Sequence, residues 1–442
     1  MNQFTKFEDL LTAISKDDLK KENQNKIMKI QTPKGTRDFL PEEAINFFKL
    51  IGVVRKVFEE YGFDPIITPA FESFVLLAAK GGLGEAVKDE IYYFKDKSDR
   101  ELGLRFDMTM PLARVVSSNP QIPKPFKRYV IDKVWRYDNP QAMRWREFWQ
   151  ADIDVVGSNS VLADVECLAA VCKILSELGF KDYFIRVNSR KLLDNLLNKS
   201  VPENKILEVF RILDKQDKIG IEGVINELDS IGVDGKAIVK VITDKNIDIS
   251  SFEGGNEIKE LFEYAKAYGI DKRLKLDLSL VRGLEYYTGV VFEVYAGAEV
   301  SCGGGGRYDN LIEVVGGTRI PATGISLGLD RLFEVIKKKK MFEVKRTETK
   351  VFVANVDEKM KIETIKIVQR LRNKGVSCQT DLMNRNLSKQ LQYADSLGIP
   401  YAVVVGEKEV KENKFKLKDM KKKTERSLKL DEIIDIIICR GN

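Results

Sequence analysis

Arginine, tyrosine and glycine gather in one short stretch of this chain, residues 280–293. Arg282, the pair Tyr286-Tyr287 and Gly289 come directly before a run of β-branched and aromatic residues. Such a run predicts a strand, and its polar end indicates a ligand site rather than plain core packing. A guanidinium group stays charged, so Arg282 could stabilise developing negative charge but could not act as a base.

A second group of arginines surrounds a predicted turn. Arg136 ends one predicted strand, Asn139-Pro140 marks the turn, and Arg144 and Arg146 begin the return strand. Arginine makes planar, paired contacts with phosphate and stacks on aromatic rings, so this hairpin could clamp a nucleotide. Taken alone, the same pattern also fits a salt-bridged surface hairpin.

A glycine-marked strand runs into a helix at residues 324–332. Gly324 and Gly328 allow close approach of the backbone, and Arg331 in the first helical turn could lie over a nucleotide. The alternative is a helix start that carries a local ion pair between Asp330 and Arg331.

Four consecutive glycines occupy residues 303–306, directly before Arg307, Tyr308 and Asp309. Glycine adds no side-chain packing to a strand, so the run could leave room for a ligand against bare backbone. Its spacing fits neither a Walker A loop nor a dinucleotide-binding fingerprint. A flexible linker is the alternative.

A predicted strand at residues 103–107 ends in an acid, Asp107, and the hydroxyl of Thr109 follows. Together they could receive an ammonium group. The alternative is that they cap the following helix.

Composition narrows the chemistry and the class of protein. Histidine is absent from all 442 residues, which excludes imidazole bases, Ser-His and Cys-His pairs and His-ligated metals. The five cysteines form no Cys-x-x-Cys pair, so we expect neither protein-held zinc nor a disulfide framework. The net charge of +6 permits a nucleic-acid partner without requiring one. No apolar run reaches the roughly 20 residues of a membrane helix, and the acidic N-terminus predicts no targeting peptide. We therefore expect a cytoplasmic protein.

The hydrophobic pattern predicts an α+β fold in several parts. A long helix begins at Pro41, and a short strand between prolines follows it, which is typical of a sheet edge. Antiparallel strands are expected over 126–137 and 147–156, whereas alternating strands and helices after residue 349 predict a small parallel α/β domain. The predicted divisions are an N-terminal extension with one short helix (1–30), a first catalytic part (31–189), a helical insertion (190–272), a second catalytic part (273–340) and the C-terminal domain (349–442).

The order of these signals resembles motifs 1, 2 and 3 of the class II aminoacyl-tRNA synthetases. The segments around Arg282 and Gly303 resemble two segments peculiar to the histidine enzymes. The opening residues 32–38 and the tail residues 386–395 are also similar to that family, the tail to its anticodon-binding domain. The resemblance spans residues 31–440. It implies an antiparallel sheet flanked by helices, a homodimer formed through residues 41–69, and ATP-dependent attachment of L-histidine to its tRNA.

The resemblance also implies roles for individual residues. Arg136 and Arg331 would hold the ATP phosphates, with Gly328 beside them, Arg144 on the distal phosphates and Arg146 as a neighbour. Arg282, with Arg136, would be catalytic, and Mg²⁺ would bridge other phosphate oxygens. The histidine pocket would comprise Asp107, Thr109, Gln150, Asp154, Tyr286, Tyr287 and Tyr308.

The sequence departs from the family pattern at several positions. Asp107 and Asp154 stand where glutamate is also common, Trp149 stands where histidine or tyrosine is frequent, and the loop between Gln141 and Arg144 is short. The short loop puts the position of Arg146 and the acceptor-end contacts in question. A synthetase for histidine that contains no histidine can be made without its own product, although compositional drift would give the same sequence.

Three other functions remain open at this stage. A regulatory paralogue that senses histidine would share the fold, but such paralogues lose the catalytic arginines and the C-terminal domain. A synthetase for another amino acid would share the class motifs. A plain RNA-binding protein would use residues 411–430, which hold nine Lys/Arg against three Asp/Glu and could equally form a solvated hairpin.

Overall fold

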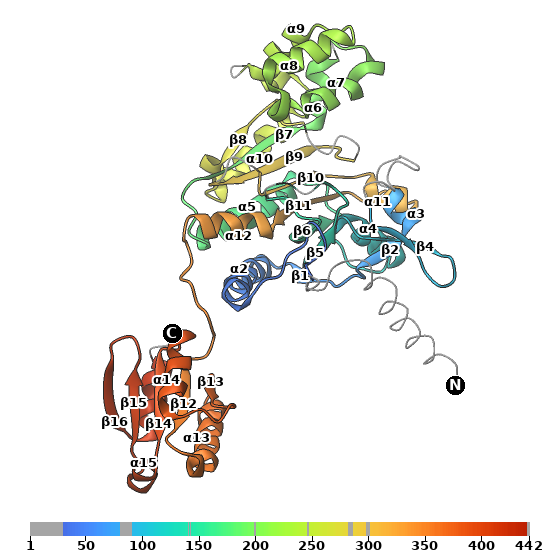
Figure 1. Ribbon diagram of the computed structural model, residues 1–442. Helices are drawn as coiled ribbons and strands as arrows, with labels where there is room; N and C mark the ends of the chain where they lie inside the picture. The colour runs from blue at the N-terminus through green and yellow to red at the C-terminus, as the bar shows by residue number, and fades with distance from the viewer. Residues whose placement is uncertain are drawn as a thin grey trace, which may run out of the picture.

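The computed structural model describes residues 30–79, 91–139, 141, 143–198, 200–244, 247–281, 286–297 and 301–439 (Figure 1). The predicted N-terminal helix and the candidate Arg282 lie outside these residues. The proposed domain boundaries stay a prediction, and the elements are given below as the structure has them.

An eight-stranded sheet forms the centre of the molecule, in the order β1-β5-β6-β11-β10-β9-β7-β8. The predicted strand between prolines is β1, which lies at the sheet edge and pairs in parallel with β5. The central strands pair antiparallel, including the predicted pair β5 and β6. The bounds are β1 Asp64–Pro65, β5 Phe126–Trp135, β6 Glu147–Val156, β7 Tyr183–Ser189, β8 Leu274–Leu276, β9 Val290–Ala296, β10 Gly303–Arg307 and β11 Ala322–Gly328.

Three helices pack together with this sheet: α2 (Pro41–Glu60), α5 (Val161–Glu177) and α12 (Leu329–Lys338). Their apolar residues recur every three or four positions, so each helix presents one apolar face. Leu50 and Val54 of α2 and Leu168 of α5 are completely buried in the same core as the strands. The sheet is therefore held from one face, and its other face is left for a site.

A smaller sheet, β2-β4-β3, lies beside the large one with α3, α4 and α11. Its strands are antiparallel neighbours, and helices α4 and α11 contact each other. The end of β4 leads into residues 105–108 and then α4, so this unit carries Asp107 and Thr109. The bounds are β2 Phe71–Ser73, α3 Phe74–Ala78, β3 Tyr93–Lys95, β4 Glu101–Leu104, α4 Thr109–Ser118 and α11 Leu311–Gly316.

Helices fill the segment between β7 and β8, as the sequence predicts. Gly220 has a φ of +71°, a left-handed conformation that glycine adopts without strain, and it divides α8 in two. Helix α10 packs against α5 and β7, so its buried residues join the main core. The bounds are α6 Arg190–Leu197, α7 Ile206–Leu213, α8 Gln216–Ser230, α9 Gly235–Thr243 and α10 Gly255–Ala267.

The C-terminal part has its own sheet, β13-β12-β14-β15-β16, and stands apart from the rest in Figure 1. β12, β13 and β14 are parallel as predicted. The predicted strands did not include β15 and β16, which pair antiparallel and extend the sheet beyond β14. The bounds are β12 Val351–Asn355, α13 Lys361–Asn373, β13 Cys378–Thr380, α14 Leu387–Ser396, β14 Tyr401–Val405, α15 Glu407–Glu412, β15 Phe415–Asp419, β16 Thr424–Leu428 and α16 Leu430–Cys439.

Chain length explains the antiparallel addition. A parallel neighbour needs a crossover of about a dozen or more residues, and residues 406–414 are too few. The basic segment that sequence left open between an RNA-binding stretch and a solvated hairpin is this hairpin, with exposed Lys421, Lys422 and Lys423 at its turn.

Candidate active site

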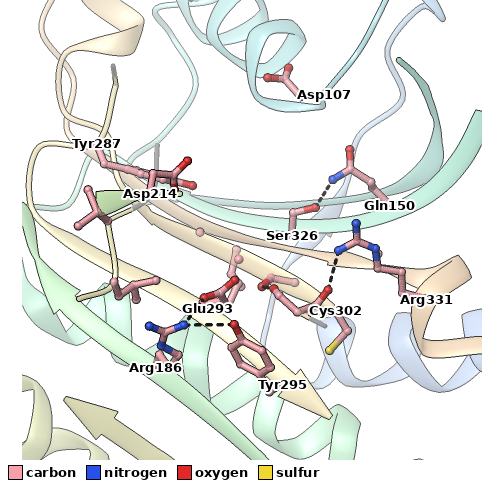
Figure 2. A pocket seen from close by; sticks show the side chains of 18 of the residues that line it. Asp107, Gln150, Arg186, Asp214, Tyr287, Glu293, Tyr295, Cys302, Ser326 and Arg331 are labelled. Carbon is pink, nitrogen blue, oxygen red and sulfur yellow. Dashed lines mark hydrogen bonds and ion pairs between the residues drawn. The ribbon is translucent and has the colours of Figure 1, made fainter. Parts of the chain in front are cut away.

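A cavity of about 1310 Å³ opens over the face of the large sheet. Figure 2 shows Asp107 on one side of it and Arg186, Glu293 and Tyr295 on the other. Strands β6 to β11 contribute to its lining, as do the short loop after β5 and the junction between α7 and α8. It gathers the described candidate residues other than Arg146: Asp107, Thr109, Arg136, Arg144, Gln150, Asp154, Tyr286, Tyr287, Tyr308, Gly328 and Arg331.

Two arginines singled out by sequence are not among those lining residues. Arg282 lies outside the described residues, so its role stays a prediction. Arg146 does not line the cavity; its Nε donates to Asp138 O at 3.1 Å, and its guanidinium lies 4.6 Å from the centre of the Tyr137 ring.

One face of β6 carries the polar end of the cavity. Gln150, Asp152 and Asp154 alternate along the strand and so point to the same side of the sheet. Opposite them on β11 stand Gly328, Ser326 and Gly324, respectively. All three β6 side chains are at least nine-tenths buried.

Asp154 is held from two sides. Its Oδ2 lies 2.5 Å from Nη2 of the fully buried Arg128, its neighbour on β5, and its Oδ1 accepts from the Tyr308 hydroxyl. Burial and the Asp154 charge raise the pKa of Tyr308 well above its ordinary value, so the hydroxyl keeps its proton and donates. The carboxylate that sequence assigned to the substrate is thus also part of a buried ion pair.

Asp152 and Ser326 were missed by the sequence reasoning. Ser326 Oγ donates to Asp152 Oδ1 and accepts from Gln150 Nε2 at 2.6 Å (Figure 2). Burial raises the pKa of Asp152 to about 7, Arg128 opposes this rise, and the Asp154 charge adds to it. A signal existed, because Asp152 lies halfway between two candidates with a strand period of two.

Asp107 has the capping role that the sequence left open, and its role toward an ammonium group stays a prediction. Its Oδ1 accepts from the Met110 backbone N–H at 3.1 Å, which caps the first turn of α4. The side chain is buried and also lines the cavity beside Thr109. Capping orients the carboxylate toward the site.

Three tyrosines form an aromatic wall. The ring centres of Tyr286 and Tyr287 are 4.2 Å apart, and those of Tyr286 and Tyr308 are 6.5 Å apart. Burial raises the pKa of Tyr286, so its hydroxyl stays neutral. Neutral hydroxyls over a carboxylate suit a ring that carries one hydrogen-bond donor and one acceptor.

Cationic groups gather at another part of the cavity. Arg136 Nε donates to Phe106 O at 3.1 Å, and its guanidinium lies 5.3 Å from the centre of the Phe148 ring. Arg331 is oriented by backbone oxygens, with Nη1 2.6 Å from Ser301 O and Nε 3.3 Å from Met143 O. These contacts hold two guanidinium groups at the rim, where phosphate could bind.

Hydrogen bonds to the buried Asp330 fix the start of α12. Asp330 accepts from the Trp149 backbone N–H at 2.6 Å and from Arg37 Nη2 at 2.7 Å. The Arg37 guanidinium also lies 3.9 Å from the centre of the Trp145 ring. The opening segment therefore ties the arginine hairpin to α12, which neither motif shows by itself.

Arg186 forms a second polar cluster that the sequence analysis did not identify. Its guanidinium contacts Asp277 at 2.7 Å, Glu293 at 3.3 Å and the Tyr295 hydroxyl at 3.2 Å (Figure 2). Its partners come from β9 and from the segment after β8, so only the folded sheet brings them together.

The glycine run at residues 303–306 is also required by the close pairing of two strands. Gly303, Gly304 and Gly305 line the cavity, but a Cβ at Gly305 would lie 2.0 Å from Gly324 O, and one at Gly303 would lie 2.6 Å from Ser326 O. These glycines thus permit close approach of β10 and β11. The linker alternative was wrong, because the run is a central strand.

The described ranges show neither a metal-binding cluster nor a membrane-spanning helix. They contain no group of three or more Cys, Asp and Glu side chains arranged to hold a metal ion. In the same part of the chain, no helix is both long and apolar enough to cross a membrane.

Known proteins match this chain over nearly its whole length. A family model described as histidyl-tRNA synthetase matches residues 35–332, and one described as an anticodon binding domain matches residues 350–440. The histidine–tRNA ligase of Pyrococcus furiosus is 36% identical over 428 residues, which cover 92% of this chain and 98% of the relative.

Solved structures are also similar to this chain over most of its length. The crystal structure of histidyl-tRNA synthetase from Nostoc sp. has a TM-score of 0.82 and 31% identity, and covers 93% of this chain and 100% of its own. A structure from Bacillus halodurans, described as an ATP phosphoribosyltransferase regulatory subunit/histidyl-tRNA synthetase, has a TM-score of 0.71 and 22% identity over 83% of this chain and 97% of its own. That similarity shows the fold alone. The chain belongs to the histidyl-tRNA synthetase family.

Proposed function

We propose that this chain attaches histidine to its tRNA through a histidyl-adenylate. The observation that carries this proposal is one cavity with a carboxylate-and-tyrosine end around Asp154 and Tyr308 and a guanidinium rim formed by Arg136 and Arg331. The first end suits an imidazole and an ammonium group, and the second suits the phosphates of ATP. Membership of the family supports the same reaction.

The first step forms a bond between the histidine carboxylate and the α-phosphorus of ATP and breaks the bond to pyrophosphate. Such transfers depend on positioning and charge neutralisation more than on covalent help. Arg136 and Arg331, both oriented by backbone oxygens, would bind the phosphates, with Gly328 beside them and Arg144 on the distal ones. Arg282 would neutralise charge on the α-phosphate.

Selection of histidine would come from the opposite end. Asp107, Thr109 and Gln150 would meet the ammonium and carboxylate groups, and Asp154, Tyr287 and Tyr308 the imidazole, with Tyr286 completing the wall. A site that hydrogen-bonds both ring nitrogens leaves its polar groups unpaired with an apolar rival, which strongly disfavours the rival. In the second step the adenylate passes its histidyl group to the terminal ribose of the tRNA, and AMP leaves.

Mg²⁺ is expected to accompany ATP rather than to occupy a protein cage. Two carboxylates that line the cavity are already engaged: Asp330 with Arg37 and Trp149, and Glu293 with Arg186. The described residues thus fit a metal held mainly on the phosphates, where it would neutralise their charge.

A homodimer through residues 41–69 is part of the proposal, as is a cytoplasmic location. β1 is an edge strand, and large apolar side chains are exposed around it, with Ile67 93% and Phe48 65% exposed. Light scattering should give twice the mass of the chain, and Ile67→Asp should lower the apparent mass. A monomer at micromolar concentration would contradict the dimer.

The deciding experiment is ATP–pyrophosphate exchange with each of the twenty amino acids, on wild type and Arg282→Ala. Exchange with histidine alone, largely lost in Arg282→Ala, supports the activation step and its central residue. Arg100→Ala is the matched control, since that side chain is exposed and forms an ion pair with the nearby Asp96.

Other results of the exchange experiment would favour the alternative functions. No exchange with any amino acid would favour the regulatory paralogue, and exchange with another amino acid would keep the fold but overturn the pocket. RNA binding without ATP-dependent activity would favour the plain RNA-binding protein.

A further inference from the structure

Three side chains in the cavity form a directed chain of hydrogen bonds. Gln150 Nε2 donates to Ser326 Oγ at 2.6 Å, and Ser326 Oγ donates to Asp152 Oδ1. Within the described part of the molecule, Gln150 Oε1 is buried and accepts no hydrogen bond. Figure 2 shows Gln150 and Ser326 together at this end of the cavity.

The direction of the chain follows from the chemistry of its last member. An ionised carboxylate only accepts hydrogen bonds, and a serine hydroxyl has one proton to give. When Ser326 gives that proton to Asp152, it accepts from the amide of Gln150. The amide must then turn its NH₂ group to Ser326, which leaves its oxygen for a ligand.

We propose that Asp152 is a positioning residue for the amino-acid substrate: through Ser326 it fixes the amide of Gln150 with Oε1 toward the substrate's α-ammonium group. An ammonium group carries three donors and no acceptor, so an amide turned the other way would repel it. This inference rests on the proposed function and adds to it the residue that sets the polarity of the ammonium site.

The charges around Asp152 favour the same arrangement. Asp154 lies on the same strand, Arg128 approaches from β5, and Asp107 faces it from the residues before α4. Three carboxylates thus lie together near the fully buried guanidinium of Arg128, and this grouping of negative charge suits a cationic ligand. Tyr286, another titratable group near Asp152, stays neutral because burial raises its pKa.

Protonation of Asp152 would weaken the orientation of the Gln150 amide. A protonated carboxyl can donate to Ser326, which could then donate to Gln150 Oε1 and reverse the chain. Because the pKa of Asp152 is about 7, the chain is fully directed only above that pH.

The main test is Asp152→Asn, measured in ATP–pyrophosphate exchange. The new amide can donate to Ser326 and permits the reversed chain. We expect the KM for histidine to rise about tenfold or more, from the loss of a hydrogen bond to a charged group. The KM for ATP and kcat should change by less than about threefold, since Gln150 is the group affected.

A compensating variant separates positioning from general damage. Gln150→Glu alone should also raise the KM for histidine. The single hydroxyl proton of Ser326 cannot be donated both to Asp152 and to the new carboxylate at position 150. Combined with Asp152→Asn, Gln150→Glu should restore the KM to within a few-fold of wild type, since a glutamate side chain presents only acceptors. If the double variant is as impaired as the worse single variant, the inference is wrong.

Ser326→Ala gives an independent test that does not depend on the folding of Asp152→Asn. The KM for histidine of wild type should rise as pH falls through about 7, and Ser326→Ala should lose the part of this rise that comes from Asp152. Comparing the two enzymes cancels the titration of the substrate itself. Identical pH profiles would overturn the inference while leaving the proposed function intact, whereas absence of histidine-dependent exchange in wild type would overturn both.

Discussion

Arg307 Nη2 lies 2.5 Å from Asp164 Oδ2, and both side chains are buried where β10 meets the start of α5. Arg307 also donates to Ser158 O at 2.7 Å and to Ser160 O at 2.9 Å. The arginine that follows the glycine run therefore anchors a helix and does not line the cavity. It holds β10, and with it Tyr308, in place over Asp154.

Removing this arginine should destabilise the protein strongly. Arg307→Met leaves Asp164 buried without its partner, and we expect a loss of about 3–5 kcal/mol in the free energy of unfolding, measured by urea denaturation. The matched control is Arg370→Met, which breaks the exposed pair with Asp431 and should cost less than about 1 kcal/mol. Similar losses in both variants would contradict an anchoring role for Arg307.

Gly324 should not tolerate a side chain. A Cβ there would lie 2.0 Å from Asp154 Oδ1 and 2.7 Å from Ile153 O. Gly324→Ala should therefore displace Asp154, lower stability by about 1–3 kcal/mol and raise the KM for histidine more than that for ATP. Gly52→Ala, in the open on α2, should instead be neutral or stabilise by up to about 1 kcal/mol. An unchanged KM for histidine in Gly324→Ala would argue against Asp154 as a contact of the ring.

Arg331 should matter for ATP more than for histidine. Its guanidinium is held by Ser301 O and Met143 O at the rim, so Arg331→Ala removes a fixed charge from the phosphate site. We expect kcat/KM for ATP to fall about 10²–10³-fold in the exchange assay. Arg331→Lys should recover only part, because an ammonium cannot keep both backbone contacts and a paired phosphate contact. Full activity of Arg331→Ala would exclude this residue from the phosphate site.

The pKa of Asp152 predicts a pH-dependent stability of the ligand-free protein. Burial raises the pKa of this carboxyl from its ordinary value of 3.8 to about 7 in the folded protein. Between these values the native state holds the extra proton, so the contribution of this group to stability is lost as pH rises from about 4 to 7. Asp152→Asn should therefore be closer to wild type in stability at pH 4.5 and relatively more stable at pH 8. The free energy of unfolding of both proteins can be measured by urea denaturation across this pH range. If the two curves run parallel, the pKa of Asp152 is not raised.

Local patterns in the sequence determined most of the elements and many of the candidate residues. The hydrophobic pattern predicted the antiparallel pair β5 and β6 and the long helix α2, and prolines placed β1 at the sheet edge. Motif order along the chain indicated the family, because each motif is a contiguous run whose glycines and arginines can be recognised without knowing their partners.

Tertiary structure decided what those patterns could not contain. Ser326 and Asp152 are 174 positions apart, and Arg307 and Asp164 are 143 apart. The first pair meets because β11 lies against β6, and the second because the end of β10 meets the start of α5. The same holds for the buried partner of Asp154, for the Arg186 cluster and for the antiparallel end of the C-terminal sheet. Hydrogen bonds and buried ion pairs depend on distances of about 3 Å in space, and a sequence records only separation along the chain.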